Sequence, residues 1–437
     1  MKTIIGLHFI PLLLIANVQL TYSDKVIEKS KVLVVLSDGM RWDHYGLDLP
    51  HFKNIQDTGV KADWMDGSFV TLSSASMTTI STGLYQESHG VVHNVYWNVE
   101  YKNRTSGFFD TLNVTEFFDT GSCEPIWVTA INQGLKAGTI NYPGGSVAIK
   151  GVKPTKDIPN TWWAFQHYGL KQRVDDAINW LTNDDFDLVM LYFNQPDGAL
   201  HSYGIGDPRT DAQLREVDDV IGYMFEQIDE ASLTNVLNVI IVSDHGHVNQ
   251  DVKKDVMLYD YVDEGDFEFV VGDYGPIVQI MPKEGRLDKI YEQLSNAHPA
   301  LYVFQKKDFP TRLHYANHPR ILPIIGFVDI GWSLHLNSTP DDGWKSDHGY
   351  DNQWMLMKSI FYAKGPAFKS GFRSPNFESV NVYPLMCELL GIIPSANNGS
   401  RGNYVNMLQI GTNSADYVHD SAFRAFIVIA LFYLALV

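Results

Sequence analysis

Three apolar stretches of the sequence end in side chains that can bind metal ions. Asp38 ends "KVLVVLSD", Asp197 and His201 follow "DLVMLYFN", and Asp244 with His245 follow "NVIIVS". Taken singly, each Asp is equally compatible with a helix cap or a turn residue. Carboxylate oxygen and imidazole nitrogen together are ligands that suit zinc. Three such endings therefore predict a metal site at one edge of a sheet.

Two further segments add to this chemistry. His348, in "KSDHGYDN", is a fourth candidate ligand that a sheet could bring to the same place. The stretch "FVTLSSASMTTISTGLYQESHG" is rich in hydroxyl groups, one of which could stand at a helix N-terminus facing the metals. A serine hydroxyl is a weak nucleophile without a base or a metal. Two metal ions that flank a phosphoryl group would support in-line displacement at phosphorus.

The elements that must position these residues alternate along the chain. Strand-like runs cover 31–38, 186–194 and 237–246, and amphipathic stretches cover 170–183 and 209–230. The second amphipathic stretch has apolar residues at the spacing of one helical face: Leu214, Val217, Val220, Ile221 and Met224. This alternation predicts an α/β domain on a largely parallel sheet. Such sheets bind ligands beyond the carboxyl ends of their strands.

Composition limits the classes of partner. The chain has 437 residues, 45% of them apolar, and a formal net charge of −18. This charge argues against nucleic acid, because phosphate backbones are bound by clusters of Lys and Arg. An anionic substrate would need a local positive centre, which bound metal ions would supply.

Both ends of the sequence resemble processing signals. Residues 1–23 have the layout of a secretory signal peptide: Lys2, an apolar run, then small and polar residues. Residues 411–437 combine small residues, a polar spacer and the apolar run "AFIVIALFYLALV", which is typical of a glycolipid (GPI) anchor signal. A short membrane span is the alternative, although Arg424 would sit poorly in it. Between the two signals, 24–410 is expected to form the catalytic domain.

An exported chain also gives meaning to its sequons and cysteines. N-linked glycans are expected at four sequons: Asn103, Asn113, Asn337 and Asn398. Cys123 and Cys387 allow at most one internal disulfide. The apolar spacing around Cys387 favours a buried free thiol there.

Several motifs of the sequence resemble those of a known family. The sequence is similar to the ectonucleotide pyrophosphatase/phosphodiesterase family of the alkaline phosphatase superfamily, and most similar to its short members. The resemblance covers nearly the whole mature chain, in the motifs "SDG", "TGLYQESHGVVHN", "PDGALHSYG", "SDHG", "MPKEGRLDKIYEQLSNAHP", "HGYDN" and "GPAF". It implies an alkaline-phosphatase-like sheet flanked by helices, with a small cap or insert region.

The resemblance implies two zinc ions per chain. Asp38, Asp244 and His245 fall where the family binds one zinc ion, and the nucleophile bridges the metal centre. The second zinc ion would be bound by Asp197, His201 and His348.

The resemblance also implies the nucleophile. Counting from Phe69 and from Gly83 places it at Ser73, with Thr71 and Ser74 as the alternatives. Asn94 falls where the family places an oxyanion donor. Three other histidines match no ligand position: His247 is expected in a loop or supporting a ligand, and His89 and His93 are expected to be structural or supporting.

The sequence departs from the family around the nucleophile. Ser74 and Ile140 stand where aromatic residues often stack a nucleobase. Each such contact is worth about 1–3 kcal/mol, so losing both would weaken a preference for nucleotides. Tyr142, Phe69 and Trp163 are candidates to replace them.

Three functions follow for comparison. The first is an extracellular two-zinc phosphodiesterase or pyrophosphatase acting on ATP, ADP, NAD or dinucleoside polyphosphates through a covalent Ser73 intermediate. The alternative keeps the chemistry but takes a choline-type glycerophosphodiester or lysophospholipid, which would need an aromatic and acidic pocket. The third, a catalytically silent receptor domain, is disfavoured because all seven ligand positions are filled.

Overall fold

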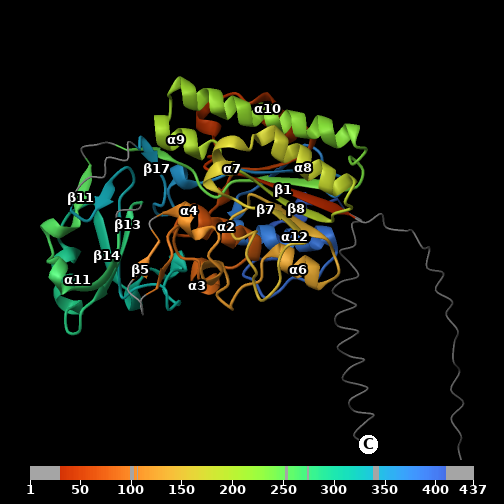
Figure 1. Cartoon of the computed structure of the whole chain (residues 1–437). Coiled ribbons are helices and arrows are strands. Elements are labelled where there is room, and N and C mark those ends of the chain that lie inside the picture. The colour runs from red at the N-terminus through yellow and green to blue at the C-terminus, as the bar shows by residue number, and fades with distance from the viewer. Residues whose placement is uncertain are drawn as a thin grey trace, which may run out of the picture.

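A computed structural model describes residues 30–98, 103–105, 107–250, 254–272, 275–337 and 344–409. An eight-stranded sheet runs through its larger part (Figure 1). Its strands, in spatial order, are β19 (Phe372–Ser374), β2 (Val60–Ala62), β18 (Phe361–Lys364), β9 (Leu237–Val242), β1 (Lys31–Ser37), β8 (Leu188–Phe193), β6 (Ala137–Ile140) and β7 (Lys156–Ile158). Only β18 runs antiparallel to its neighbours. The predicted α/β fold with a mostly parallel sheet is confirmed.

Helices cover both faces of this sheet because successive side chains of a buried strand point to opposite sides. Val32, Val34 and Leu36 of β1 pack into one apolar core, and Leu33 and Val35 pack into the other. The first core includes α2 (Ser73–Thr82), α6 (Ile126–Asn132) and α12 (Val382–Leu390); the second includes α1 (Pro50–Thr58), α8 (Leu170–Thr182) and α10 (Pro208–Glu230). In Figure 1, α8 and α10 lie above the sheet, and α6 and α12 lie below it.

The three predicted strands and two predicted helices form where the sequence pattern placed them. The strands end one to four residues earlier than expected, which leaves the metal-capable residues on loops or, for Asp197 and His201, on the next helix. Helix α10 begins at Pro208, after Asp207, whose side chain accepts a hydrogen bond from the backbone N–H of Arg209. Proline at the first helical position and aspartate before it are strong helix-start signals.

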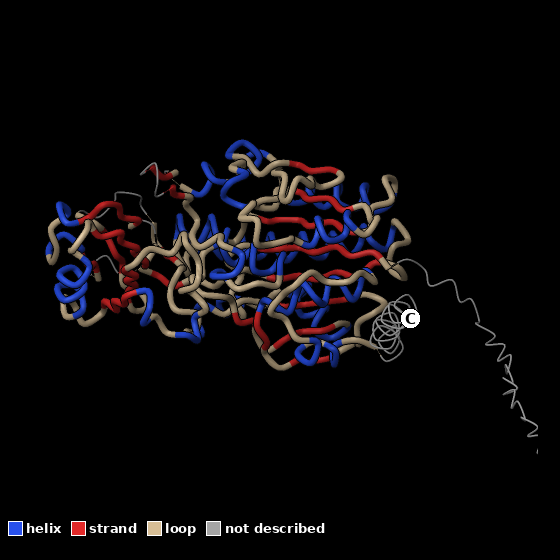
Figure 2. Tube along the Cα trace, turned by 90° about the horizontal axis from the view of Figure 1, so that it is seen from below, coloured by secondary structure: helices blue, strands red, loops and turns tan. Residues whose placement is uncertain are grey.

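A smaller antiparallel sheet forms the expected insert region. Its strands are β12 (Phe267–Val271), β13 (Ile277–Pro282), β15 (Ile324–Val328) and β14 (Leu301–Gln305), with α11 (Leu287–Ser295) beside β14. It lies at one end of the molecule in both views (Figures 1 and 2). Phe69, Val70 and Leu72, just before α2, share an apolar core with β13 and β15. This packing ties the start of α2 to the insert.

The two predicted processing signals, 1–23 and 411–437, lie outside the described residues. Within the part of the chain that the structure describes, no helix is long and apolar enough to cross a membrane. Cys123 and Cys387 are both buried free thiols. Of the sequon asparagines, Asn113, Asn337 and Asn398 are exposed, as glycosylation would require.

Candidate metal centre

The register of the central strands brings the predicted ligands together. Ser37 of β1 pairs with Phe193 of β8, and Leu36 pairs with Val242 of β9. The chains leaving β1 and β8 stay in contact, because the backbone N–H of Asp197 donates to the carbonyl of Asp38 at 3.1 Å. Parallel strands in register deliver their loops to one edge of the sheet. That edge holds the candidate site.

The first set of residues, here called the carboxylate group, consists of Asp38, Asp244, His245 and Ser73. His245 Nε2 lies 3.4 Å from Asp38 Oδ1 and 3.2 Å from Asp244 Oδ2. The Ser73 hydroxyl oxygen lies 3.2 Å from the same nitrogen. All four side chains are buried. Four potential donor atoms thus lie close together, which is the number of ligands that zinc usually binds.

The carboxylate group contains buried oxygen atoms without hydrogen bonds from the described part of the chain, and a bound cation would neutralise them. Asp38 Oδ1 and Asp244 Oδ2 are buried and receive no hydrogen bond from any described residue. Burial, together with the charges of Asp197 and Asp244, raises the pKa of Asp38 well above its ordinary value. Burial also raises the pKa of Asp244, to about 7. Unpaired buried carboxylates are costly, and buried charges are normally paired or bound to metal. The residues present therefore fit a divalent cation.

The second set, here called the histidine group, consists of Asp197, His201, His348 and His247. Asp197 Oδ1 lies 3.3 Å from His201 Nε2, 3.7 Å from His348 Nε2 and 2.8 Å from His247 Nε2. Burial raises the pKa of Asp197, but His201 and His247 outweigh this effect and hold it well below the ordinary value. Burial lowers the pKa of His201, but the negative charge of Asp197 outweighs this effect and raises it to about 9. Carboxylate and imidazole donors again fit zinc.

The histidine group contains a residue that sequence reasoning left aside. His247 is fully buried and contacts Asp197 directly, and burial lowers its pKa to about 3. Its position two residues after His245, in a loop already rich in ligands, was the available signal. His89 lies elsewhere, with its ring between Thr79 Oγ1 and the Val91 N–H.

Ser73 begins α2, at the end where backbone N–H groups point outward. Asn94 Nδ2 lies 3.5 Å from the Ser73 hydroxyl, and Asn94 Oδ1 accepts the Ser74 N–H at 2.8 Å. The Thr71 hydroxyl instead donates to the Tyr350 carbonyl and accepts the N–H of Gly349. Of the three hydroxyls considered from sequence, Ser73 is the one in contact with His245.

The aromatic residues expected to replace the missing stacking partners differ in access. Phe69 and Tyr142 are buried in the core, with 1% and 2% of their surface exposed, so neither can stack a ligand. Trp163 is exposed but stacks on His167. A different aromatic pair is available: the rings of Phe165 and Trp162 are stacked, 5.7 Å apart.

These two rings belong to an aromatic cluster whose third member is Phe109. The Phe109 ring packs edge-on against Trp162 and Phe165 at 5.0 and 5.2 Å. Phe165 also borders the site, because a Cβ atom at Gly198, next to Asp197, would lie 3.2 Å from its ring. Trp162 is 56% exposed, so the cluster offers an accessible aromatic face.

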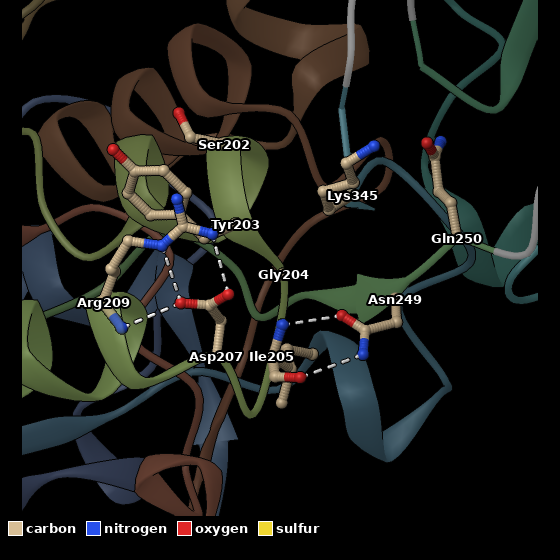
Figure 3. Close-up of a pocket in the computed structure, with 9 residues that line it drawn as sticks. All are labelled: Ser202, Tyr203, Gly204, Ile205, Asp207, Arg209, Asn249, Gln250 and Lys345. Atoms are coloured by element: carbon tan, nitrogen blue, oxygen red, sulfur yellow. Dashed lines mark hydrogen bonds and ion pairs between the residues drawn. The ribbon is translucent and has the colours of Figure 1, made fainter.

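A polar cavity of about 310 Å³ adjoins the C-terminal end of α9 (Asp197–Tyr203) (Figure 3). Its polar groups mostly bind one another: Arg209 pairs with Asp207 and lies over the Tyr203 ring, and the Asn249 side chain bonds the Ile205 backbone twice. No side chain of the two metal groups lines it. A larger cavity of about 680 Å³ lies at the amino end of β9, beside Leu237. Neither cavity contains the candidate site.

The sequence and the fold match one family of enzymes. A family model described as "Type I phosphodiesterase / nucleotide pyrophosphatase" matches residues 32–351. The chain is 41% identical over 391 residues to ectonucleotide pyrophosphatase/phosphodiesterase family member 7 of Homo sapiens, covering 87% of this chain and 84% of that protein. It is 32% identical over 382 residues to the human bis(5'-adenosyl)-triphosphatase ENPP4, covering 85% of this chain and 81% of that protein.

Solved structures of proteins from the same family align with this fold. Murine ectonucleotide pyrophosphatase/phosphodiesterase 5, as an inactive threonine-to-alanine variant in complex with AMP, aligns with a TM-score of 0.80 and 33% identity. The alignment covers 87% of this chain and all of that one. The human protein of the same name aligns with a TM-score of 0.80 and 34% identity.

Proposed function

Because the chain belongs to the type I phosphodiesterase/nucleotide pyrophosphatase family of hydrolases, we propose that it cleaves phosphodiester or pyrophosphate bonds of extracellular nucleotides with two zinc ions and Ser73 as nucleophile. The carboxylate group would hold one zinc ion, and Asp197, His201 and His348 would hold the other. The observation that carries this proposal is the meeting of the Ser73 hydroxyl with His245 Nε2, beside two buried carboxylate oxygens that receive no hydrogen bond from any described residue.

Each residue has a definite task in this reaction. When bound, the zinc ions supply Lewis acidity beside the Ser73 hydroxyl and the phosphoryl oxygens. Ser73 Oγ forms a bond to phosphorus while the bond to the leaving oxygen breaks, and the leaving group departs with the electron pair. The intermediate is a phosphodiester between Ser73 and the retained nucleoside. Water then attacks its phosphorus, the P–Oγ bond breaks, the nucleoside monophosphate leaves and the Ser73 hydroxyl is restored. Asn94 Nδ2, which already reaches towards Ser73, donates to a phosphoryl oxygen as negative charge develops there.

Nucleotides are the favoured substrate class. Among the relatives, murine family member 5 has been solved in complex with AMP, and human ENPP4 is a bis(5'-adenosyl)-triphosphatase. Phe165, which borders Gly198 next to Asp197, and Trp162, which stacks on Phe165, would provide an aromatic face for a base. Stacking of this kind is worth about 1–3 kcal/mol per base and tolerates any nucleobase. The comparisons do not favour the choline-type alternative.

A substrate panel tests the proposal. Purified protein is assayed with ATP, ADP, NAD, diadenosine triphosphate, glycerophosphocholine and lysophosphatidylcholine. We expect the nucleotides to have the highest kcat/KM, and Phe165→Ala to raise KM for them while leaving the metal content unchanged. Tyr302→Ala, at a half-exposed aromatic residue of the insert, is the control. A preference for the two choline compounds would overturn the assignment.

The cellular location follows from the two processing signals proposed at 1–23 and 411–437. The chain would enter the secretory pathway, receive glycans at the sequons and stay on the outer surface through a glycolipid anchor. Phosphatidylinositol-specific phospholipase C should then release the enzyme from cells. Retention of the enzyme together with an epitope placed at residue 437 would favour a membrane span instead.

A further inference from the structure

The ring nitrogens of His247 are arranged like those of the proposed metal ligands. Four buried or largely buried histidines surround the centre, and each directs Nε2 towards a carboxylate of the site. We propose that His247 is itself a metal ligand, which gives the histidine group four protein donors: Asp197, His201, His247 and His348. This inference rests on the two-metal site proposed above and adds to it a residue that the family resemblance leaves out.

The partners of Nδ1 determine which ring nitrogen carries the proton in the three expected ligands. The Nδ1 atoms of His201, His245 and His348 lie 2.9, 3.2 and 2.8 Å from backbone carbonyl oxygens. A carbonyl oxygen can only accept, so each Nδ1 must donate. In the neutral form of each ring, Nε2 therefore carries the lone pair, and this is the form of imidazole that binds metal.

His247 reaches the same state through a hydroxyl group. Its Nδ1 lies 3.2 Å from Ser346 Oγ, and that hydroxyl lies 2.8 Å from the Leu200 carbonyl. The hydroxyl has one hydrogen, which it donates to the carbonyl, because a carbonyl has none to give. Nδ1 of His247 must then donate to Ser346 Oγ. Its Nε2 is left with a lone pair.

That lone pair faces another acceptor. His247 Nε2 lies 2.8 Å from Asp197 Oδ1, and two lone pairs at this separation need a cation between or beside them. A proton on Nε2 would instead turn this fully buried ring into a cation, packed against three other histidines. A metal ion satisfies both atoms at once. The candidate ligand atoms of Asp197, His245, His247 and His348 all lie within 4.8 Å of one another.

Local packing keeps the His247 ring in this position. Gly39 has a φ of +72°, and a Cβ atom there would lie 3.1 Å from His247 Nε2 and 3.2 Å from the Asp197 Cα. A larger residue at 39 would therefore be strained and would crowd the ring. With four protein donors, the histidine group would accept a phosphoryl oxygen as a fifth ligand, an expansion that catalytic zinc sites undergo.

The competing role for His247 is to orient Asp197 by donating a hydrogen bond. The two roles are separated by His247→Gln and His247→Leu, because a glutamine can donate to Asp197 but is a poor zinc ligand. His348→Ala is the benchmark for loss of an expected ligand. His89→Gln is the matched control, since His89 is as buried as His247 but lies outside both groups.

Metal affinity and cobalt spectra provide readouts independent of turnover. Full-length protein is stripped, reloaded with Zn²⁺ or Co²⁺, and titrated against a chromophoric chelator. Both His247 variants should lower the affinity for one of the two zinc ions by more than about 100-fold. Loss of a residue that only supports a ligand typically lowers metal affinity by about 10–100-fold. The visible bands of the Co²⁺ protein should change in position and intensity in both variants. His89→Gln should match the parent, and circular dichroism should show that all variants are folded.

The outcomes separate failure of this inference from failure of the proposed function. Zinc affinity within threefold of the parent in His247→Leu, or recovery of affinity and of the cobalt spectrum in His247→Gln, would overturn the ligand role. The two-metal proposal itself fails if the parent binds less than one zinc ion, or if His348→Ala binds as much zinc as the parent.

Discussion

The carboxylate group and the histidine group are built in different ways. In the first, Asp38 and Asp244 follow adjacent strands of the central sheet, and their side chains are almost fully buried. In the second, Asp197 and His201 lie on α9, and His348 comes from a segment 147 residues further on than His201. The side chains of Asp197 and His201 keep 16% and 12% of their surface exposed. One group is fixed by the sheet, and the other is assembled from distant parts at the edge of solvent.

The balance of charge differs as well. The carboxylate group has two carboxylates and one imidazole, so it is under strain from repulsion between buried anions. The histidine group has one carboxylate among three imidazoles, and that carboxylate is stabilised. We infer that the first group depends on its cation for stability, and that the second depends on precise placement of its ligands.

The largest expected effect tests the contribution that only the carboxylate group makes. Ser73→Ala removes the attacking oxygen but leaves every Asp and His ligand of both groups. Activity should fall by about 10⁴-fold or more, as for other enzymes that lose their nucleophile. Zinc content should stay near that of the parent, and Ser73→Thr should keep partial activity. Ser74→Ala, one residue on, is the control. Near-normal turnover in Ser73→Ala would mean that another group attacks phosphorus.

The next effect breaks the histidine group alone. His348→Ala should release one zinc ion and lower kcat/KM by about 10³-fold, because one side of the phosphoryl clamp is lost. Elemental analysis should still find the ion of the carboxylate group, since Asp38, Asp244 and His245 are untouched. His314→Ala, at a partly exposed histidine of the insert, should leave both ions bound. Loss of both metals in His348→Ala would show that the groups do not bind independently.

A smaller effect is expected from a hydrogen bond that orients Asp38 in the carboxylate group. The Tyr192 hydroxyl donates to Asp38 Oδ2 at 2.6 Å and so orients the other oxygen towards the centre. Tyr192→Phe should lower the affinity for one zinc ion by about 10–100-fold, which is the usual effect of losing a group that orients a metal ligand. Tyr142→Phe, which removes an equally buried hydroxyl bound to the Met77 carbonyl, is the control. Equal zinc affinities in chelator competition would contradict this role.

The smallest effect concerns the stability of metal-free protein. Asp244 has a raised pKa of about 7, so its ionisation on raising the pH from about 4 to above 7 disfavours the folded state. Stripped protein should therefore lose stability over that pH range, and Asp244→Asn should remove part of this loss. At pH 8 we expect stripped Asp244→Asn to melt about 2–5 °C above the stripped parent. With zinc present the order should reverse. A lower melting temperature for the stripped variant would argue against repulsion.

Much of this organisation could be predicted from sequence because its signals are local. Apolar runs with strand character placed the ends of β1, β8 and β9 to within one to four residues, and helical periodicity identified α8 and α10. Residues that follow parallel strands share one edge of the sheet, so Asp38, Asp197 and Asp244 could be grouped without coordinates. The class of ligands then followed from residue type. The register around Ser73 followed from a family pattern of fixed spacing.

Other features depended on contacts between segments far apart in the chain. The pattern could not tell that Phe69 and Tyr142 point into the core while Trp162 and Phe165 remain accessible, because a side chain's exposure is set by whatever packs on it. The role of His247 was equally hidden. Its proton position depends on Ser346, 99 residues away, and its place beside Asp197 depends on the space left by Gly39. The sequence alone thus determined which chemical groups the site would contain, because strand ends and residue types are local properties. Tertiary structure alone decided where each lone pair points, because that depends on partners brought together only by folding.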